Sequence, residues 1–196
     1  DNEWNDQPDP DAAWQSWSKH FMRFDERFDF APSVVRQPGR PENFAFLLKG
    51  VLFIGINKVG GAVHDQDEWR RRLEADAQWI SHHLAGRGRH ARAAVIFAQA
   101  AAPGFGDRFL TPFRAAAVQF AKPILYLHAD GHQWFVVSGQ WATNNIVQVQ
   151  VDRINGKFPP VRFIVTTDRK NPFLFRRRLD RSFDAHQAKS VPAVSD

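Results

Sequence analysis

The stretch PILYLHADGH at residues 123–132 decides the fold, because an apolar run of strand length ends there in a cluster of polar side chains. Residues 51–56, VLFIGI, and residues 93–98, AAVIFA, form two further continuous apolar runs. Such runs are typical of strands that are buried on both faces. Segments with helical periodicity lie between them, at about residues 65–84 and 107–121. Strands that alternate with helices over long crossovers predict an α/β fold with a parallel or mixed sheet.

The flanking sequence predicts smaller elements. Residues 43–48 and 51–59 are expected to form a hairpin about Lys49-Gly50. Before it, we expect a helix over residues 12–28 that is capped by Asp11 and packs an aromatic stripe into the core. The stripe consists of Trp14, Trp17, Phe21, Phe24 and Phe28. Downstream, residues 134–138, 146–152 and 160–167 predict an antiparallel meander, and a short helix is expected at residues 173–183.

Composition narrows the classes of protein to consider. The chain has 196 residues, 18 Phe, 7 Trp and no Cys, so it can fill a sizeable core and holds neither disulfides nor thiolate metal sites. No apolar run approaches the roughly 20 residues that span a bilayer. Residues 169–196 hold +4 of the net charge of +5, so we interpret them as a basic extension after a domain of residues 1–168. That distribution argues against nucleic acid as a partner, because a binding domain concentrates charge on its folded face.

The polar cluster at the end of residues 123–127 carries the candidate chemistry. His128, Asp130 and His132 are spaced two apart at a strand end, which in open α/β sheets is where ligands collect. Side chains with this spacing can converge on a cation. The alternative is structural, since a lone His at a strand end is usually only hydrogen-bonded.

Four segments together resemble the calcineurin-like metallophosphoesterases. Residues 126–134, YLHADGHQW, look like the closing Gly-His-x-His metal motif of that superfamily. The opening residues 1–4, DNEW, are similar to its Gly-Asn-His motif in a divergent subgroup that reads Gly-Asp-Asn-Glu-Trp. Residues 53–57, FIGIN, and 94–99, AVIFAQ, stand where the family has intermediate strands. The resemblance covers residues 1 to about 167 and implies a mixed β-sheet sandwich flanked by helices (αββα), incomplete at its N-terminus.

The resemblance also implies a set of metal ligands. Asn2 would be the amide ligand, Gln99 stands where a His ligand is usual, Asp130 replaces the first His of the closing motif, and His132 matches the second. The implied cofactors are divalent ions (Mn, Fe, Zn or Mg). The oxygen donors of Gln99 and Asp130 shift the preference toward Mn²⁺ or Mg²⁺.

For catalysis, the resemblance points to Glu3 and His128. Glu3 stands where the family commonly has a His that protonates the leaving alkoxide, and His128, one step before the motif, would hydrogen-bond a ligand. The implied substrate is a phosphorylated small molecule, a phosphate mono- or diester. Asn57 and Lys58 at a strand end could contact its phosphate. The subgroup often carries a secretory leader, which is compatible with an extracytoplasmic location, but the sequence itself fixes no compartment.

Two hypotheses follow from what the sequence lacks. The family's Asp-x-His and Gly-Asp motifs, which supply the first ligands and the bridging carboxylate, are not found in these 196 residues. A two-metal phosphoesterase needs both ions, so we expect this chain by itself to be inactive. The first hypothesis is a metal-dependent phosphoesterase that depends on upstream motifs. The second is a non-catalytic binding domain that retains the scaffold, with the basic tail docking an acidic partner or an anionic membrane.

Overall fold

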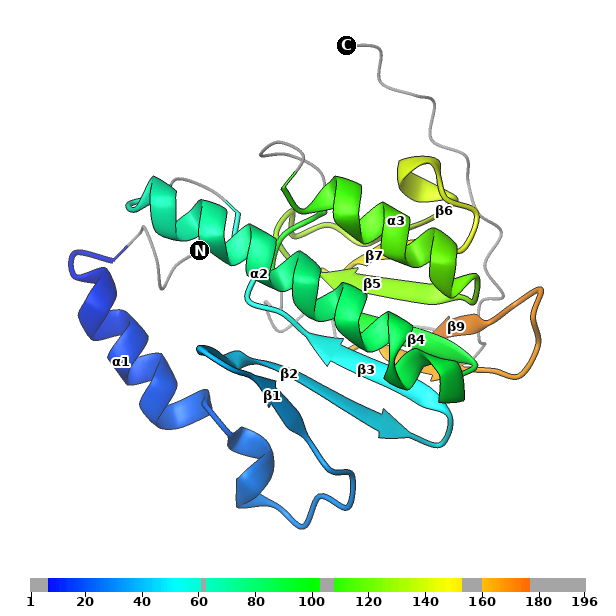
Figure 1. The fold of residues 1–196 in the computed structure, drawn as a ribbon, viewed down its shortest axis with the longest axis horizontal. Coiled ribbons are helices and arrows are strands. Elements are labelled where there is room, and N and C mark those ends of the chain that lie inside the picture. Colours follow the sequence, from blue (N-terminus) through cyan, green and yellow to red (C-terminus); the bar gives the residue numbers. More distant parts are fainter. Residues whose placement is uncertain (1–6, 61–62, 103–107, 153–159, 177–196) are drawn as a thin grey trace.

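A seven-stranded mixed sheet forms the centre of the molecule (Figure 1). The computed structural model describes residues 7–60, 63–102, 108–152 and 160–176. The sheet has the order β1-β2-β3-β4-β5-β7-β6, and β8 and β9 form a separate two-stranded sheet. The strands are β1 Val35–Gln37, β2 Arg40–Leu48, β3 Val51–Gly55, β4 Ala93–Phe97, β5 Ile124–His128, β6 Phe135–Ser138, β7 Ile146–Gln150, β8 Arg162–Val165 and β9 Phe173–Arg176. The helices are α1 Pro10–Phe21, α2 Gln66–Ala85 and α3 Leu110–Phe120, with 3-10 turns η1 Phe24–Arg27, η2 Arg87–His90 and η3 Gln140–Ala142.

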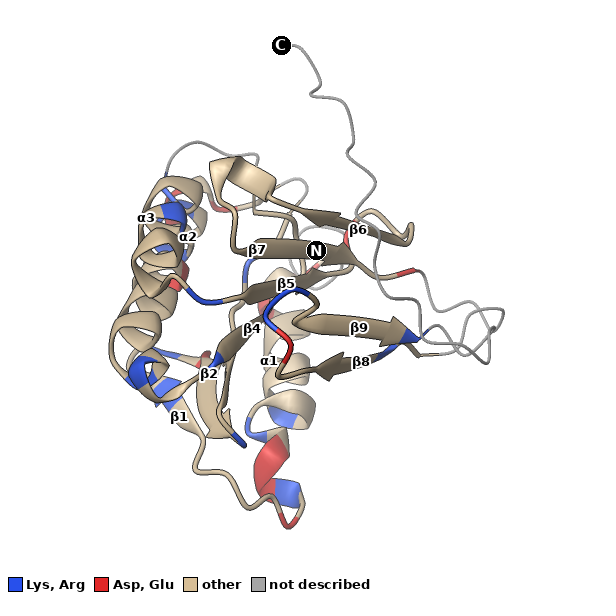
Figure 2. Cartoon of the chain, turned by 90° about the vertical axis from the view of Figure 1, so that its right-hand side faces the viewer, with Lys and Arg blue, Asp and Glu red and all other residues tan. Residues whose placement is uncertain are grey.

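The predicted α/β class is confirmed by the strand pairing. Strands β3, β4, β5 and β7 are parallel to one another, whereas β1, β2 and β6 pair antiparallel with their neighbours. The crossovers from β3 to β4 and from β4 to β5 contain α2 and α3, and both helices cover the same face of the sheet (Figure 1). The β8–β9 hairpin lies against the opposite face (Figure 2). The four parallel strands therefore end together at one edge, which we call the carboxyl edge.

Each face of the sheet has its own core. On the helical face, Leu52, Ile96 and Tyr126 are fully buried against α2 and α3. On the other face, Val95, Leu125 and Val149 are buried beneath the hairpin. The hairpin contributes Phe173 and Phe175, whose alternation with half-buried neighbours is the period of a strand. The helix predicted over residues 173–183 is therefore wrong for residues 173–176, and its remainder lies outside the described residues.

Two elements at the start of the chain differ from the sequence prediction. The first helix is capped by Asp9, not by Asp11, and ends at Phe21 because the backbone of Met22 leaves the helical region, with φ −59° and ψ 131°. The aromatic stripe is not core: Phe21, Phe24 and Phe28 are 57%, 46% and 61% exposed. Periodicity identifies an apolar helix face, but it does not say whether another layer covers that face. Here α1 lies to one side of the sheet (Figure 1), and its aromatic rings contact mainly one another.

The predicted antiparallel meander is also wrong in its topology. Strand β7 inserts between β5 and β6, where it pairs parallel with β5 and antiparallel with β6. Strand β8 pairs with β9, not with β7. Short strands without intervening helices are compatible both with a meander and with the observed order. In the observed order, the valines that alternate along β7 lie beside the apolar residues of β5.

Arg92 fixes the turn end of the hairpin to the main sheet. It directly precedes β4, and its guanidinium donates to the carbonyl oxygens of Val165, at 3.2 Å, and Thr166, at 3.4 Å. It also donates to the carbonyl oxygen of Lys49 in the β2–β3 turn. One side chain thus joins the hairpin to two strands at the edge opposite the carboxyl edge.

His83 in α2 gives a first testable prediction. Its ring is buried against Trp79, and neither ring nitrogen has a hydrogen-bond partner among the described residues. Burial lowers the pKa of His83 from 6.5 to about 4, so the unfolded chain binds a proton more readily between these values. We expect wild type to lose stability as pH falls from about 6.5 to 4, and His83→Phe to lose less, by on the order of 1–3 kcal/mol in urea titrations.

The exposed His90 of η2 supplies the control for this prediction. His90→Gln should leave the dependence of the unfolding free energy on pH as it is in wild type. An equal effect of both substitutions would mean that the burial of His83 is not the cause.

Candidate functional site

Side chains from three neighbouring strands meet at the carboxyl edge. Gln99 follows β4, and its Nε2 donates to Oδ1 of Asp130, which follows β5, at 3.2 Å. On its other side, Oε1 of Gln99 accepts from the backbone N–H of Gly60, which follows β3, also at 3.2 Å. Backbone bonds link the same segments, from Ala100 N to Lys58 O at 3.0 Å and from Asp130 N to Gln99 O at 3.2 Å. Gln99 is therefore the central link of the edge.

A buried cation lies beneath this link. Lys58 has 0% exposure, its Nζ donates to the carbonyl oxygen of Ala101, and it lies 5.4 Å from the ring centroid of Phe109. Burial lowers the pKa of Lys58 to about 8, although Asp76 and Asp130 oppose that shift by favouring the charged ammonium. The site therefore has a positive charge close to the Asp130 carboxylate and out of contact with solvent.

Asp76 in α2 is connected through hydrogen bonds to the segment that leads to the same edge. Its Oδ1 accepts from Nδ2 of Asn43 at 2.7 Å, and Oδ1 of Asn43 accepts from the backbone N–H of Asn57 at 2.8 Å. Burial raises the pKa of Asp76 to about 7, against the opposing effects of the Asn43 hydrogen bond and of Arg72. The carboxylate thus sets the start of the loop that carries Lys58 and Gly60.

Sequence reasoning missed Asp76, although a signal was present. Asp76 lies three residues after Leu73 and four before Ile80, both of which are fully buried in α2. This spacing places it on the buried face of the helix. A carboxylate on such a face is rare without a partner, so the position marks a buried polar site.

The two histidines of the polar cluster have different surroundings. His128 is buried, and its Nε2 lies 2.8 Å from Nε2 of Gln148, which donates to it, while Nδ1 has no hydrogen-bond partner among the described residues. Burial lowers the pKa of His128 to about 4, with Asp130 raising it and Lys58 lowering it further. His132 is exposed and has a left-handed backbone, φ 53°. His128 is therefore a neutral, fixed ring, and His132 is open to solvent.

The predicted site residues are only partly brought together. Gln99 and Asp130 are in contact, and Gln99, His128 and His132 line one cavity of about 540 Å³ at the carboxyl edge. Asn2 and Glu3 lie outside the described residues. Within the described ranges, no group of three or more His, Asp or Glu side chains could hold a metal ion. Two of the polar groups already have hydrogen-bond partners, because Oδ1 of Asp130 accepts from Gln99 and Nε2 of His128 accepts from Gln148.

Comparison with known proteins identifies no related family, so the geometry of the carboxyl edge is the basis for assigning a function. No family model matches the sequence, and no curated protein matches it. Among the helices that the structure describes, none has both the length and the apolar character needed to cross a bilayer.

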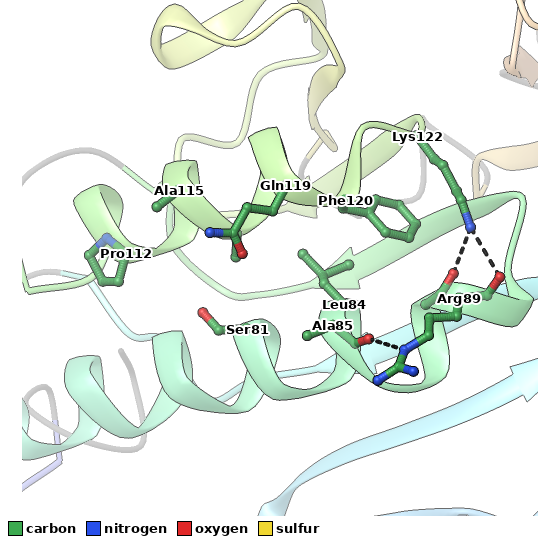
Figure 3. A pocket seen from close by; sticks show the side chains of 11 residues that line it. Ser81, Leu84, Ala85, Arg89, Pro112, Ala115, Gln119, Phe120 and Lys122 are labelled. Atoms are coloured by element: carbon green, nitrogen blue, oxygen red, sulfur yellow. Dashed lines mark hydrogen bonds between the residues drawn. The ribbon is translucent and has the colours of Figure 1, made fainter.

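A second cavity, of about 460 Å³, lies between α2 and α3 and offers less chemistry (Figure 3). Its two cationic side chains are already engaged. Lys122 Nζ donates to the carbonyl oxygens of Gly88, at 2.8 Å, and Ala91, at 2.7 Å. Arg89 Nε donates to the carbonyl oxygen of Ala85 at 3.1 Å. These bonds cap the ends of the helical layer, so we interpret the cavity as a groove between packed helices.

Proposed function

We propose that the carboxyl edge is the substrate-facing part of a metal-dependent phosphoesterase site that acts on a phosphate mono- or diester. The observation that carries the proposal is the link from Gly60 through Gln99 to Asp130. It joins the ends of three adjacent parallel strands, and the segments involved are those that resemble the metallophosphoesterase motifs. The arrangement of a main sheet between a helical layer and a second, two-stranded sheet is compatible with the layers of an αββα sandwich.

Each described residue has a role that its surroundings allow. Asp130 offers a half-buried carboxylate, and Gln99 fixes its orientation. Lys58 supplies a fixed positive charge, which stabilises negative charge at the edge in a medium of low dielectric. His132 is exposed and lines the cavity, so its ring can contact a phosphate oxygen or coordinate a metal ion.

Divalent ions would supply charge stabilisation and activation of water when bound. Since no group of three or more His, Asp or Glu side chains in the described ranges could hold a metal ion, the proposal takes further ligands from outside those ranges. In this proposal, Asn2 contributes one of them and Glu3 serves as the general acid.

Substitution of Asp130 tests this proposal. In the protein supplied with Mn²⁺, Fe²⁺, Zn²⁺ or Mg²⁺, Asp130→Asn should lower kcat/KM for p-nitrophenyl phosphate or its bis ester by about 100-fold, because the carboxylate loses its charge. His132→Ala should also lower it. His90→Ala, an exposed histidine of η2, is the matched control and should keep wild-type activity. Absence of metal-dependent hydrolysis in the wild-type protein would reject the enzyme.

A specific observation favours the second candidate function, a non-catalytic binding domain. The polar groups of the edge largely satisfy one another, since Gln99 bonds Asp130 and His128 bonds Gln148. Such a site can recognise a phosphate group without hydrolysing it. Binding of inorganic phosphate in calorimetry, weakened by His132→Ala and unaffected by added metal, would support this function over the enzyme.

A further inference from the structure

The cavity at the carboxyl edge, which Gln99 borders, has a mainly apolar lining. Its floor is formed by the ends of three adjacent strands of the main sheet. Phe97 and Leu127 are register partners on β4 and β5, and Val151 follows β7, with its N–H bonded to the carbonyl oxygen of His128 at 2.9 Å. All three side chains are only half-buried, although they adjoin the core beneath the hairpin. We call this space the hairpin chamber.

The hairpin forms the opposite wall of the chamber. Phe163 of β8 and Phe175 of β9 are directly opposed in the hairpin register, and both line the space together with Val161. Phe175 is buried, and its ring lies 5.9 Å from that of Trp134. The wall is therefore a fixed aromatic pair, which offers flat apolar surface to whatever occupies the chamber.

The chamber combines a few polar groups with a larger apolar lining. Gln99, His128, His132 and Asp152 border the cavity, whereas the remaining lining is almost entirely apolar. A cavity of about 540 Å³ is within the range of small-molecule sites, which combine apolar walls with a few polar groups that fix orientation. The half-buried rings and aliphatic side chains stay in contact with water until an apolar group displaces it.

We propose that the hairpin chamber receives an apolar organic group of the substrate, an aryl or branched alkyl group joined to the phosphate that the carboxyl edge holds. This inference rests on the proposed function, because it is the phosphate that places the organic group beside Phe163 and Phe175. It makes Val161, Phe163 and Phe175 specificity-determining residues. Esters of small polar alcohols, such as glycerol phosphate, leave the chamber filled with water and are poorer substrates.

Binding of 1-naphthol, which has the aryl group without the phosphate, tests the chamber directly. In calorimetry on the full chain, we expect 1-naphthol to bind wild type and to bind Val161→Asp at least about tenfold more weakly, because the carboxylate must be desolvated. Val118→Asp, on the exposed face of α3, is the matched control and should bind as wild type does. Phe163→Ala, which removes half of the aromatic wall, is a second variant that keeps the test open if Val161→Asp fails to fold.

Two phosphate esters serve as further probes. They distinguish an error in the proposed role of the chamber from an error in the proposed phosphoesterase function. In the metal-supplied natural protein, kcat/KM for 1-naphthyl phosphate should exceed that for glycerol phosphate, and Val161→Asp should reduce the difference. Hydrolysis of both esters at equal efficiency, with no binding of 1-naphthol, would overturn the chamber and leave the phosphoesterase intact. Binding of 1-naphthol that Val161→Asp abolishes, without hydrolysis of either ester, would support the chamber and reject the phosphoesterase.

Discussion

Replacing Phe113 with alanine should lower the free energy of unfolding by about 3–5 kcal/mol. Phe113 lies in α3 at 0% exposure, on the side that faces the main sheet. Its ring centroid is 5.6 Å from that of Phe109, 5.8 Å from that of Tyr126 and 6.1 Å from that of Trp141. The substitution leaves a cavity among aromatic rings that cannot collapse without moving the sheet, which accounts for the size of the effect.

Urea unfolding followed by circular dichroism would measure this loss. Val118 is the control because it lies in the same helix and is 62% exposed, so Val118→Ala should change the free energy of unfolding by less than about 0.5 kcal/mol. If the two substitutions shift the midpoint equally, α3 does not pack against the sheet as described.

Replacing Asp76 with asparagine should remove a dependence of stability on pH. Burial raises the pKa of Asp76 from 3.8 to about 7, so between these values the folded protein binds a proton that the unfolded chain has lost. The contribution of Asp76 is therefore favourable at low pH and is lost as pH rises from about 4 to 7, by on the order of 2–4 kcal/mol. Asparagine retains the oxygen that accepts from Asn43 and carries no charge, so the variant should gain stability over wild type toward pH 7.

The difference between the variant and wild type is the quantity to follow, because buried histidines change stability in the opposite direction at low pH. Asp67→Asn in the same helix, with a 75% exposed side chain, should show no comparable trend. A difference in unfolding free energy between Asp76→Asn and wild type that stays constant from pH 4 to 7 would contradict the raised pKa.

The sequence predicted the centre of the fold well because burial there requires a specific composition. The continuous apolar runs at β3, β4 and β5 have few alternatives to interior strands, and α2 at Gln66–Ala85 matches the helix expected at about residues 65–84. The prediction failed where the partner of an apolar surface decides the outcome. The aromatic stripe of α1 and the pairing of β7 depend on which elements come together, and that information is not local.

The candidate site divides in the same way. Asp130 was predictable because parallel strands bring their carboxyl ends to one edge, whereas Gln99, its hydrogen-bond partner, was named only through the family resemblance. Lys58 was noted as a possible phosphate contact, but its full burial was not foreseen. The hairpin chamber was not predictable, since its walls come from strands that are distant in the sequence and belong to two sheets.

The contacts of Arg92 anchor one end of the hairpin. They hold its turn, at Val165 and Thr166, to the main sheet. Toward the other end of the same two strands, Phe175 is buried in the core beneath the hairpin, and its ring contacts that of Trp134. The hairpin is therefore attached at both ends, so the aromatic wall of the chamber is in place before a ligand enters and its ordering costs no binding free energy.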